Sequence, residues 1–262
     1  MSGLEEIFIG GFDYRHLISI GFVLAGGSFI QSAVGFGYGL WAFPLLLFLT
    51  DLPVPGVIAL MGSSGFIQSS VSAYHHRKYV VWKKLFPFII IGIISLQVGI
   101  WTLHSLQGLD RSTIKQMTGA ILLSILIIQY IFSVQPREKV HPFWGVIALF
   151  LFGYISGIDA MGGPFAVLWV MAHQWSNRQM RGSIIAIIVC VIPFQVFLLV
   201  SQFGPVALNA AVLGLLFMPM ALLGTFAGLW IGDRIPKKRL RRLAVGLLFI
   251  IAATAILHPL FQ

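Results

Sequence analysis

Two glycine-rich stretches inside long apolar runs carry the residues with the most chemical potential. Residues 26–44 read GGSFIQSAVGFGYGLWAFP, and residues 153–164 read GYISGIDAMGGP. A glycine in a helix interior costs about 1 kcal/mol relative to alanine, so these clusters predict breaks in two helices. A helix that restarts inside a membrane presents free backbone N–H groups at its first turn, and these groups attract an anion. We therefore expect the two breaks to face each other and to hold one small anion.

The candidate anion-binding residues lie at these two breaks. They are Gln31, Ser32, Gly35, Phe36, Gly37 and Tyr38 in the first, and Gly162, Gly163 and Pro164 in the second. Glycine lets an oxyanion approach the backbone closely, and a proline in the first helical turn loses no hydrogen bond. Gln31 needs a polar partner at this depth, whereas Tyr38 can equally serve packing. The alternative for the glycines is close packing of helices.

Three charged residues near the second break could act on the anion or on its coupling. Asp159 is the only carboxylate deep in an apolar run, and an intramembrane acid is a functional candidate by default. We consider it a proton-coupling candidate; its alternative role is structural, bonding free N–H groups of the break. Arg178 and Arg181 follow this break and are expected at the cytoplasmic mouth, where they either attract the anion or only set the topology.

The composition excludes the soluble classes. Of 262 residues, 58% are hydrophobic and 10% are charged, against about 25% charged in soluble domains. Long apolar runs recur along the whole chain. They predict an all-α integral membrane protein, a polytopic helical bundle that forms a single transmembrane domain over residues 1–262. The net charge of +9 then reports cytoplasmic loops rather than nucleic-acid binding.

No residue pattern indicates a metal, a cofactor or an enzyme. Cys190 is the only cysteine, which excludes an internal disulfide and a cysteine metal cluster. His75 and His76 are adjacent in a basic loop, which is a poor metal site. The sequence has no Walker A motif and no Ser/His/Asp, HExxH or paired-carboxylate arrangement. We therefore predict a protein that is not an enzyme and that binds no cofactor and no metal.

Eight hydrophobic elements position these residues, and their order repeats. The first half has a broken run at residues 17–50 and clean runs at 56–74, 85–106 and 114–134. The second half has a broken run at residues 143–175 and clean runs at 184–200, 206–230 and 243–257. Each half, 16–134 or 143–260, therefore reads as a broken helix or hairpin plus three transmembrane helices. An overlay of residues 34–37 on 161–164 places Ser32 on Asp159.

The basic residues select a topology. Of the 17 Lys and Arg, four lie in residues 75–84, two in 135–142, two in 176–182 and six in 232–242. If both broken runs return to the side they entered, these 14 share one face, which the positive-inside rule assigns to the cytoplasm. If every run crosses, the bias almost disappears. We therefore predict two inverted repeats, as in secondary transporters. For the first broken run, the prediction that it returns to the side it entered rests on Arg15 and on the likeness of this run to the second broken run.

Three motifs in this order resemble the TauE/SafE sulfite exporter family, also called TSUP. They are QSAVGFGYGLWAFPLL, GYISGIDAMGGPFAVLWVMAHQWSNRQMRG and WIGDRIPKKRLRRL, and together they span nearly the whole chain. Phe165 departs from the family pattern, which commonly has a second proline there. The resemblance implies a transporter of sulfite, sulfoacetate or another sulfur-containing or organic anion, with export as the direction.

We therefore expect an inner-membrane secondary transporter that exports a small anion by alternating access, with protons as the candidate coupling ion. The basic loops 75–84 and 232–242 are expected in the cytoplasm. An anion channel is the main alternative, and a non-transport membrane assembly factor is another. The expected partners are the anion and the lipid bilayer, without nucleic acid, and a homodimer is the candidate assembly.

Overall fold

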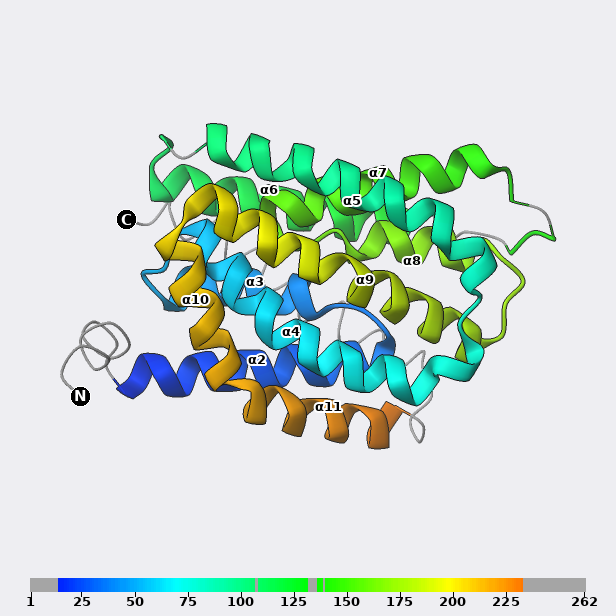
Figure 1. The fold of residues 1–262 in the computed structure, drawn as a ribbon, viewed down its shortest axis with the longest axis horizontal. Coiled ribbons are helices and arrows are strands. Elements are labelled where there is room, and N and C mark those ends of the chain that lie inside the picture. Colours follow the sequence, from blue (N-terminus) through cyan, green and yellow to red (C-terminus); the bar gives the residue numbers. More distant parts are fainter. Residues whose placement is uncertain (1–13, 107, 132–135, 139, 233–262) are drawn as a thin grey trace.

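Helices make up the regular structure of the chain (Figure 1). The structure is a computed structural model that describes residues 14–106, 108–131, 136–138 and 140–232. Its helices are α2 (Tyr14–Val34), α3 (Tyr38–Leu49), α4 (Val54–His76), η1 (Arg77–Tyr79), α5 (Trp82–Ser105), α6 (Arg111–Ile131), α7 (Pro142–Asp159), α8 (Gly163–Met171), α9 (Asn177–Phe203), α10 (Pro205–Leu216) and α11 (Met218–Gly232). The predicted last span, residues 243–257, and nearly all of the basic loop 232–242 lie outside the described residues.

The helices are long and apolar enough for a multi-pass membrane protein. Within the described residues, α2, α4, α5, α7 and α9 each qualify as a span, and the bent pair α10–α11 makes a sixth if it is counted as one. On α5, Phe86, Ile94 and Trp101 are each more than half exposed, a face that suits lipid rather than water. By contrast α3, with 12 residues, and α8, with 9, are too short to cross a core about 30 Å thick.

The single span predicted at residues 206–230 is wrong in one respect. The structure has two helices there, α10 and α11, which are bent by 55° relative to each other. Pro219 lies in the first turn of α11. Inside a continuous helix its ring would remove one N–H bond and crowd the carbonyl four residues earlier. The chain therefore starts a new helix at Met218 instead of running straight through.

Contacts between loops define two ends of the bundle. The Asp51 end comprises residues 50–53, 106, 108–110 and 204, and parts of its first two loops line a common cavity. The Arg178 end comprises residues 77–81 and 172–178. There, Arg178 Nη1 donates to the hydroxyl of Tyr79 at 2.9 Å. Each crossing helix runs from one of these ends toward the other (Figure 1).

Helices α2 and α3 form a hairpin that opens at the Asp51 end. In Figure 1, α2 runs from that end into the bundle and α3 returns beside it. Trp41 Nε1 on α3 donates to the carbonyl of Val23 on α2 at 3.0 Å, and Gly27 packs against the ring of Tyr38. From Tyr38 to Trp41 along α3, the contact on α2 moves back from Gly27 to Val23, as in antiparallel neighbours.

Helices α7 and α8 form a second hairpin, which opens at the Arg178 end. The N–H of Arg137, just ahead of α7, donates to the carbonyl of Ala172, just after α8, at 2.8 Å. The ring centroid of Trp169 on α8 lies 5.0 Å from that of Phe88, which is near the start of α5. The free ends of both arms therefore lie together, and the two hairpins open toward opposite ends of the bundle.

The first arm of each hairpin packs along a helix from the other half of the chain. Helix α7 lies along α5, and α2 lies along α11. At the first seam, Gly153 and Gly157 face the α5 backbone, with Gly153 against the carbonyl of Gly92. At the second, Gly224 faces the carbonyl of Ala25. Small residues at such seams let membrane helices approach closely.

These seams correct part of the sequence prediction. Gly26, Gly27, Gly153 and Gly157 are helical and pack against neighbouring side chains or backbone. The breaks themselves are shorter than expected and cover only residues 35–37 and 160–162. For these four glycines, close packing, the alternative to a break, is the correct explanation.

Replacing Gly153 by alanine is expected to destabilise the fold. Its new β-carbon would overlap the carbonyl of Gly92 and the hydroxyl of Ser95, and overpacking of this kind costs about 1–3 kcal/mol. Thermal unfolding of the purified protein in detergent measures the loss. Gly163→Ala is the matched control from the same stretch, because its β-carbon would meet open space; equal melting temperatures for both variants would contradict the packing role of Gly153.

Candidate functional site

The second arm of each hairpin begins at a glycine inside the bundle. Gly37, with φ 111°, is the N-cap of α3, and Gly162 is the N-cap of α8. An N-cap side chain normally accepts a hydrogen bond from a first-turn N–H, but glycine has no side chain, and neither helix has a side-chain cap. In α8, Pro164 has no N–H and the N–H of Phe165 donates to the carbonyl of Gly162 at 3.1 Å. The N–H of Gly163 and the first-turn N–H groups of α3 are therefore the backbone donors left for whatever occupies the space in front of the two helices.

Residues of the two breaks are in direct contact. A β-carbon on Gly39, in the first turn of α3, would overlap the carbonyl oxygen of Ala160. Only glycine allows this approach. Ala160 has φ 59° and is the only non-glycine residue with positive φ in the described part of the chain. This left-handed conformation ends α7 and turns the chain toward α8.

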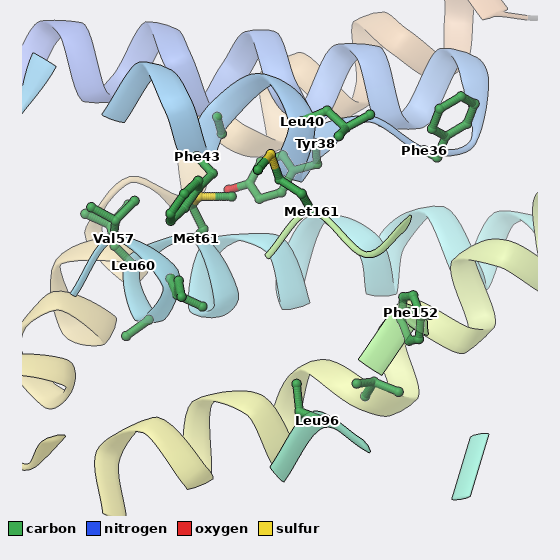
Figure 2. Close-up of a cluster of buried hydrophobic side chains, with 14 of the residues drawn as sticks. Phe36, Tyr38, Leu40, Phe43, Val57, Leu60, Met61, Leu96, Phe152 and Met161 are labelled. Carbon is green, nitrogen blue, oxygen red and sulfur yellow. The ribbon is translucent and has the colours of Figure 1, made fainter. Parts of the chain in front are cut away.

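A cavity of about 70 Å³ lies between the breaks. Its wall includes Phe36, Gly37, Tyr38 and Gly39 from the first break and the start of α3. It also includes Ala160, Met161, Gly163 and Pro164 from the second break and the start of α8, together with polar residues of the surrounding helices. Figure 2 shows Tyr38, Met61 and Met161, all lining residues, grouped between α3 and the second break. About 10–15 Å³ of such volume admits one water molecule. The space therefore suits a few waters or a small oxyanion.

Two side-chain amides, those of Gln31 and Gln195, lie in the polar part of the cavity wall. Gln31 Nε2 donates to Ser69 Oγ at 2.7 Å, and Gln195 Nε2 donates to the carbonyl of Ser156 at 2.6 Å. Each amide group has a second N–H, so each can hold its helix partner and still donate to a ligand. The hydroxyl of Tyr38 is 2.7 Å from Ser64 Oγ, a partner deep in α4.

The structure brings six of the nine predicted anion-binding residues to this cavity: Gln31, Phe36, Gly37, Tyr38, Gly163 and Pro164. The other three do not line it. Ser32 Oγ lies 3.1 Å from Ser72 Oγ, Gly35 packs against the side chain of Arg181, and Gly162 packs against the α7 backbone. These three residues pack at the hairpin tips rather than on the wall of this cavity.

The sequence prediction did not include Ser69, Ser156 or Gln195, which also line this cavity. The hydrogen bonds of the two side-chain amides have similar spacing along the sequence: Gln31 and Ser69 are 38 positions apart, and Ser156 and Gln195 are 39 positions apart. This similar spacing in the two halves is a signal for these residues. An overlay that aligns the two N-caps differs by two residues from the predicted overlay of Ser32 on Asp159. The N-caps Gly37 and Gly162 occupy corresponding places, and the same offset pairs Gln31 with Ser156.

Most of the chain matches a known protein family. The sequence profile described as Sulfite exporter TauE/SafE matches residues 18–255. The chain belongs to the TauE/SafE sulfite exporter family. No curated protein and no solved structure matches it. Membership in TauE/SafE implies a membrane exporter of sulfite or a related anion, in agreement with the resemblance of the three sequence motifs.

Asp159 of this TauE/SafE chain lies at the tip of the second hairpin. It is the last residue of α7 and is 2% exposed. Its Oδ1 accepts a hydrogen bond from the N–H of Met161 at 2.9 Å, which is the structural role considered as the alternative to proton coupling. Asp159 does not line the cavity between the breaks; it lines a second cavity of about 560 Å³ at the Asp51 end.

Arg181 lies against the tip of the first hairpin. Its side chain is 6% exposed, and Nη2 donates to the carbonyl of Ser32 at 2.5 Å. That carbonyl belongs to the last turn of α2, where the helix dipole favours a cation. Arg178, by contrast, is exposed and donates to Tyr79. The two arginines, predicted together at one mouth of the TauE/SafE transporter, have separate environments, and only Arg181 contacts a hairpin.

Replacing Arg181 by methionine is expected to lower the free energy of unfolding by about 1.5–3 kcal/mol, the usual contribution of a hydrogen bond to a charged group. The apolar chain keeps most of the volume but leaves the carbonyl of Ser32 without this donor. Arg178→Met, at an exposed position, should change stability by less than about 0.5 kcal/mol. Unfolding in detergent measures both, and an Arg181→Met protein as stable as Arg178→Met would contradict the contact's role.

Proposed function

We propose that this chain is a secondary carrier that binds one small oxyanion between the starts of α3 and α8. The observation that supports the proposal most directly is that residues of both breaks line one cavity of about 70 Å³. Helix N-termini attract anions through their free N–H groups and their dipoles. The family points to sulfite or another sulfur-containing or organic anion as the ligand, and to export as the direction.

The donors around the cavity favour an oxyanion over other small solutes. Backbone N–H groups of α3 and α8 would approach it from two sides, and the amides of Gln31 and Gln195 would add further donors. No lysine, arginine or histidine lines this cavity among the residues that the structure describes. Such a site would bind its anion through neutral donors, which permits release as well as binding.

Alternating access is the mechanism that the packing supports. The hairpins open toward opposite ends, and each first arm packs on a helix of the other half. In each half, one side-chain amide hydrogen bond joins the first hairpin arm to the helix that follows the hairpin. These features are those expected of inverted repeats with a site at their interface. Movement of one half against the other would open the anion site first to one side and then to the other.

In the orientation that we propose, the Arg178 end faces the cytoplasm of the cell that carries this protein in its inner membrane. Residues 75–84 carry four basic side chains and lie at or near that end, together with Arg178 and Arg181. The positive-inside rule places such residues in the cytoplasm. The basic loop 232–242 is assigned to the same face by the charge count.

A flux screen in proteoliposomes tests the proposed function. Sulfite, sulfate, thiosulfate, taurine, sulfoacetate and small carboxylates are compared as labelled or competing solutes. A carrier gives saturable flux and exchange between labelled and unlabelled anion. The anion-channel alternative instead gives unsaturated current at single-channel rates, and either that result or no flux of any of these anions would overturn the proposal.

Gly163→Val is expected to reduce anion flux by at least about tenfold while the protein remains folded. The new side chain would find open space at its β-carbon and extend into the cavity that Gly163 lines, in front of the first turn of α8. Gly108→Val is the matched control, since Gly108 also faces open space but lies exposed in the α5–α6 loop. Normal flux in a folded Gly163→Val protein would remove the anion site from this cavity.

Cysteine labelling tests the proposed orientation. In a Cys190→Ala background, Ser176→Cys and Gly108→Cys place single thiols at exposed positions on opposite ends of the bundle. A membrane-impermeant thiol reagent added to intact cells should label Gly108→Cys and spare Ser176→Cys until the membrane is opened. The reverse pattern would invert the orientation, and labelling of both in sealed cells would contradict a bundle that spans the membrane between them.

A further inference from the structure

A second, larger cavity enters the bundle from the Asp51 end. Its volume is about 560 Å³, enough for many water molecules. It is lined by residues at the ends of α3, α5 and α9, at the starts of α4, α6 and α10, and at the tip of the second hairpin. Asp51 and Asp159 are the only lining residues with an ionisable side chain among those that the structure describes. Asp51 is exposed, whereas Asp159 is buried at the inner wall.

The two carboxyl oxygens of Asp159 have different surroundings. Oδ1 accepts the N–H of Met161. Oδ2 is buried and has no hydrogen-bond partner in the described part of the chain. A buried, incompletely bonded carboxylate is costly, and a proton on Oδ2 would remove its charge. The carboxyl group is thus held by one oxygen while the other is available to a proton.

In the described structure, no basic side chain lies beside Asp159 to neutralise its carboxylate in place of a proton. On the side of the anion site, the only ionisable lining residue is Tyr38. On α5, which packs along α7, His104 is exposed. On α6, Lys115 lies with its ammonium 5.0 Å from the ring centroid of Phe48. Neither of these two basic residues lines either cavity.

Asp159 is joined directly to the wall of the anion site. The next two residues, Ala160 and Met161, line the cavity between the breaks, and Met161 is also the hydrogen-bond donor to Asp159. Like charges repel strongly at low dielectric. A charged carboxylate at this position would therefore oppose binding of an anion, whereas a neutral carboxylic acid would not.

We propose that Asp159 is a proton-binding site, filled through the cavity at the Asp51 end, and that its proton binds together with the anion at the breaks. In this step a proton leaves a protonated water molecule in the cavity and bonds to Oδ2 of Asp159. No other covalent bond breaks or forms. Because coupling is reciprocal, the proton strengthens anion binding and the anion strengthens proton binding. One proton then accompanies each anion, so the net negative charge carried across the membrane in each transport cycle is smaller by one.

This inference rests on the proposed anion site, and the test separates the two. Binding of sulfate, sulfoacetate and thiosulfate to the purified protein is measured from about pH 6 to about pH 8, a range in which these anions keep their charge. Where Asp159 is ionised, the apparent Kd should rise by about tenfold per pH unit. In weakly buffered solution, each bound anion should take up as much as one proton in the same range.

Asp159→Asn is the decisive variant, and Asp51→Asn is its matched control in the same cavity. The asparagine keeps an oxygen for the N–H of Met161 and is always neutral, so anion binding should persist and lose its pH dependence. Asp51→Asn should bind with the wild-type pH dependence. A wild-type Kd that does not change with pH, binding without proton uptake, or a folded Asp159→Asn protein that binds no anion would each overturn the inference while leaving the anion site in place. Failure of all three anions to bind the wild type would overturn both proposals.

Discussion

The architecture depends on two helices that begin inside the bundle without a side chain to cap them. A helix start leaves backbone N–H groups unbonded, and in a membrane such groups must face protein or a wet cavity. Here both starts follow a glycine, Gly37 or Gly162, and both face the same small cavity. The glycine contact of Gly39 with Ala160 brings the breaks close enough to share it. The rest of the bundle keeps these two starts in place.

The hairpin tips are held in chemically different ways. At the first tip, Arg181 donates to the carbonyl end of α2, so a cation meets the negative end of a helix dipole. At the second tip, Asp159 accepts an N–H of its own break and lies beside the large cavity. In the described part of the chain, a charged side chain therefore contacts each tip: Arg181 of α9 at the first and Asp159 of α7 at the second.

Much of this fold follows from glycine clustering, apolar run length and the placement of basic residues. The all-α membrane class, the order of the elements and the two helix restarts could be predicted, because breaks and spans leave strong local signals. The bend at Pro219 could also have been read locally. The seams at Gly153 and Gly224 could not be separated from the breaks, because a glycine looks the same in sequence whether it ends a helix or admits a neighbouring backbone. Likewise, Ser69 joins the site only through its bond to Gln31 across two helices.

We propose that both helix starts hold one anion at once. Selenate and selenite are heavier analogues of sulfate and sulfite, and their anomalous scattering locates them in crystals of the protein. The account predicts one site between the breaks, within hydrogen-bond distance of the N–H groups of Gly39 and Gly163. A site only at Arg178, or only in the cavity at the Asp51 end, would contradict it.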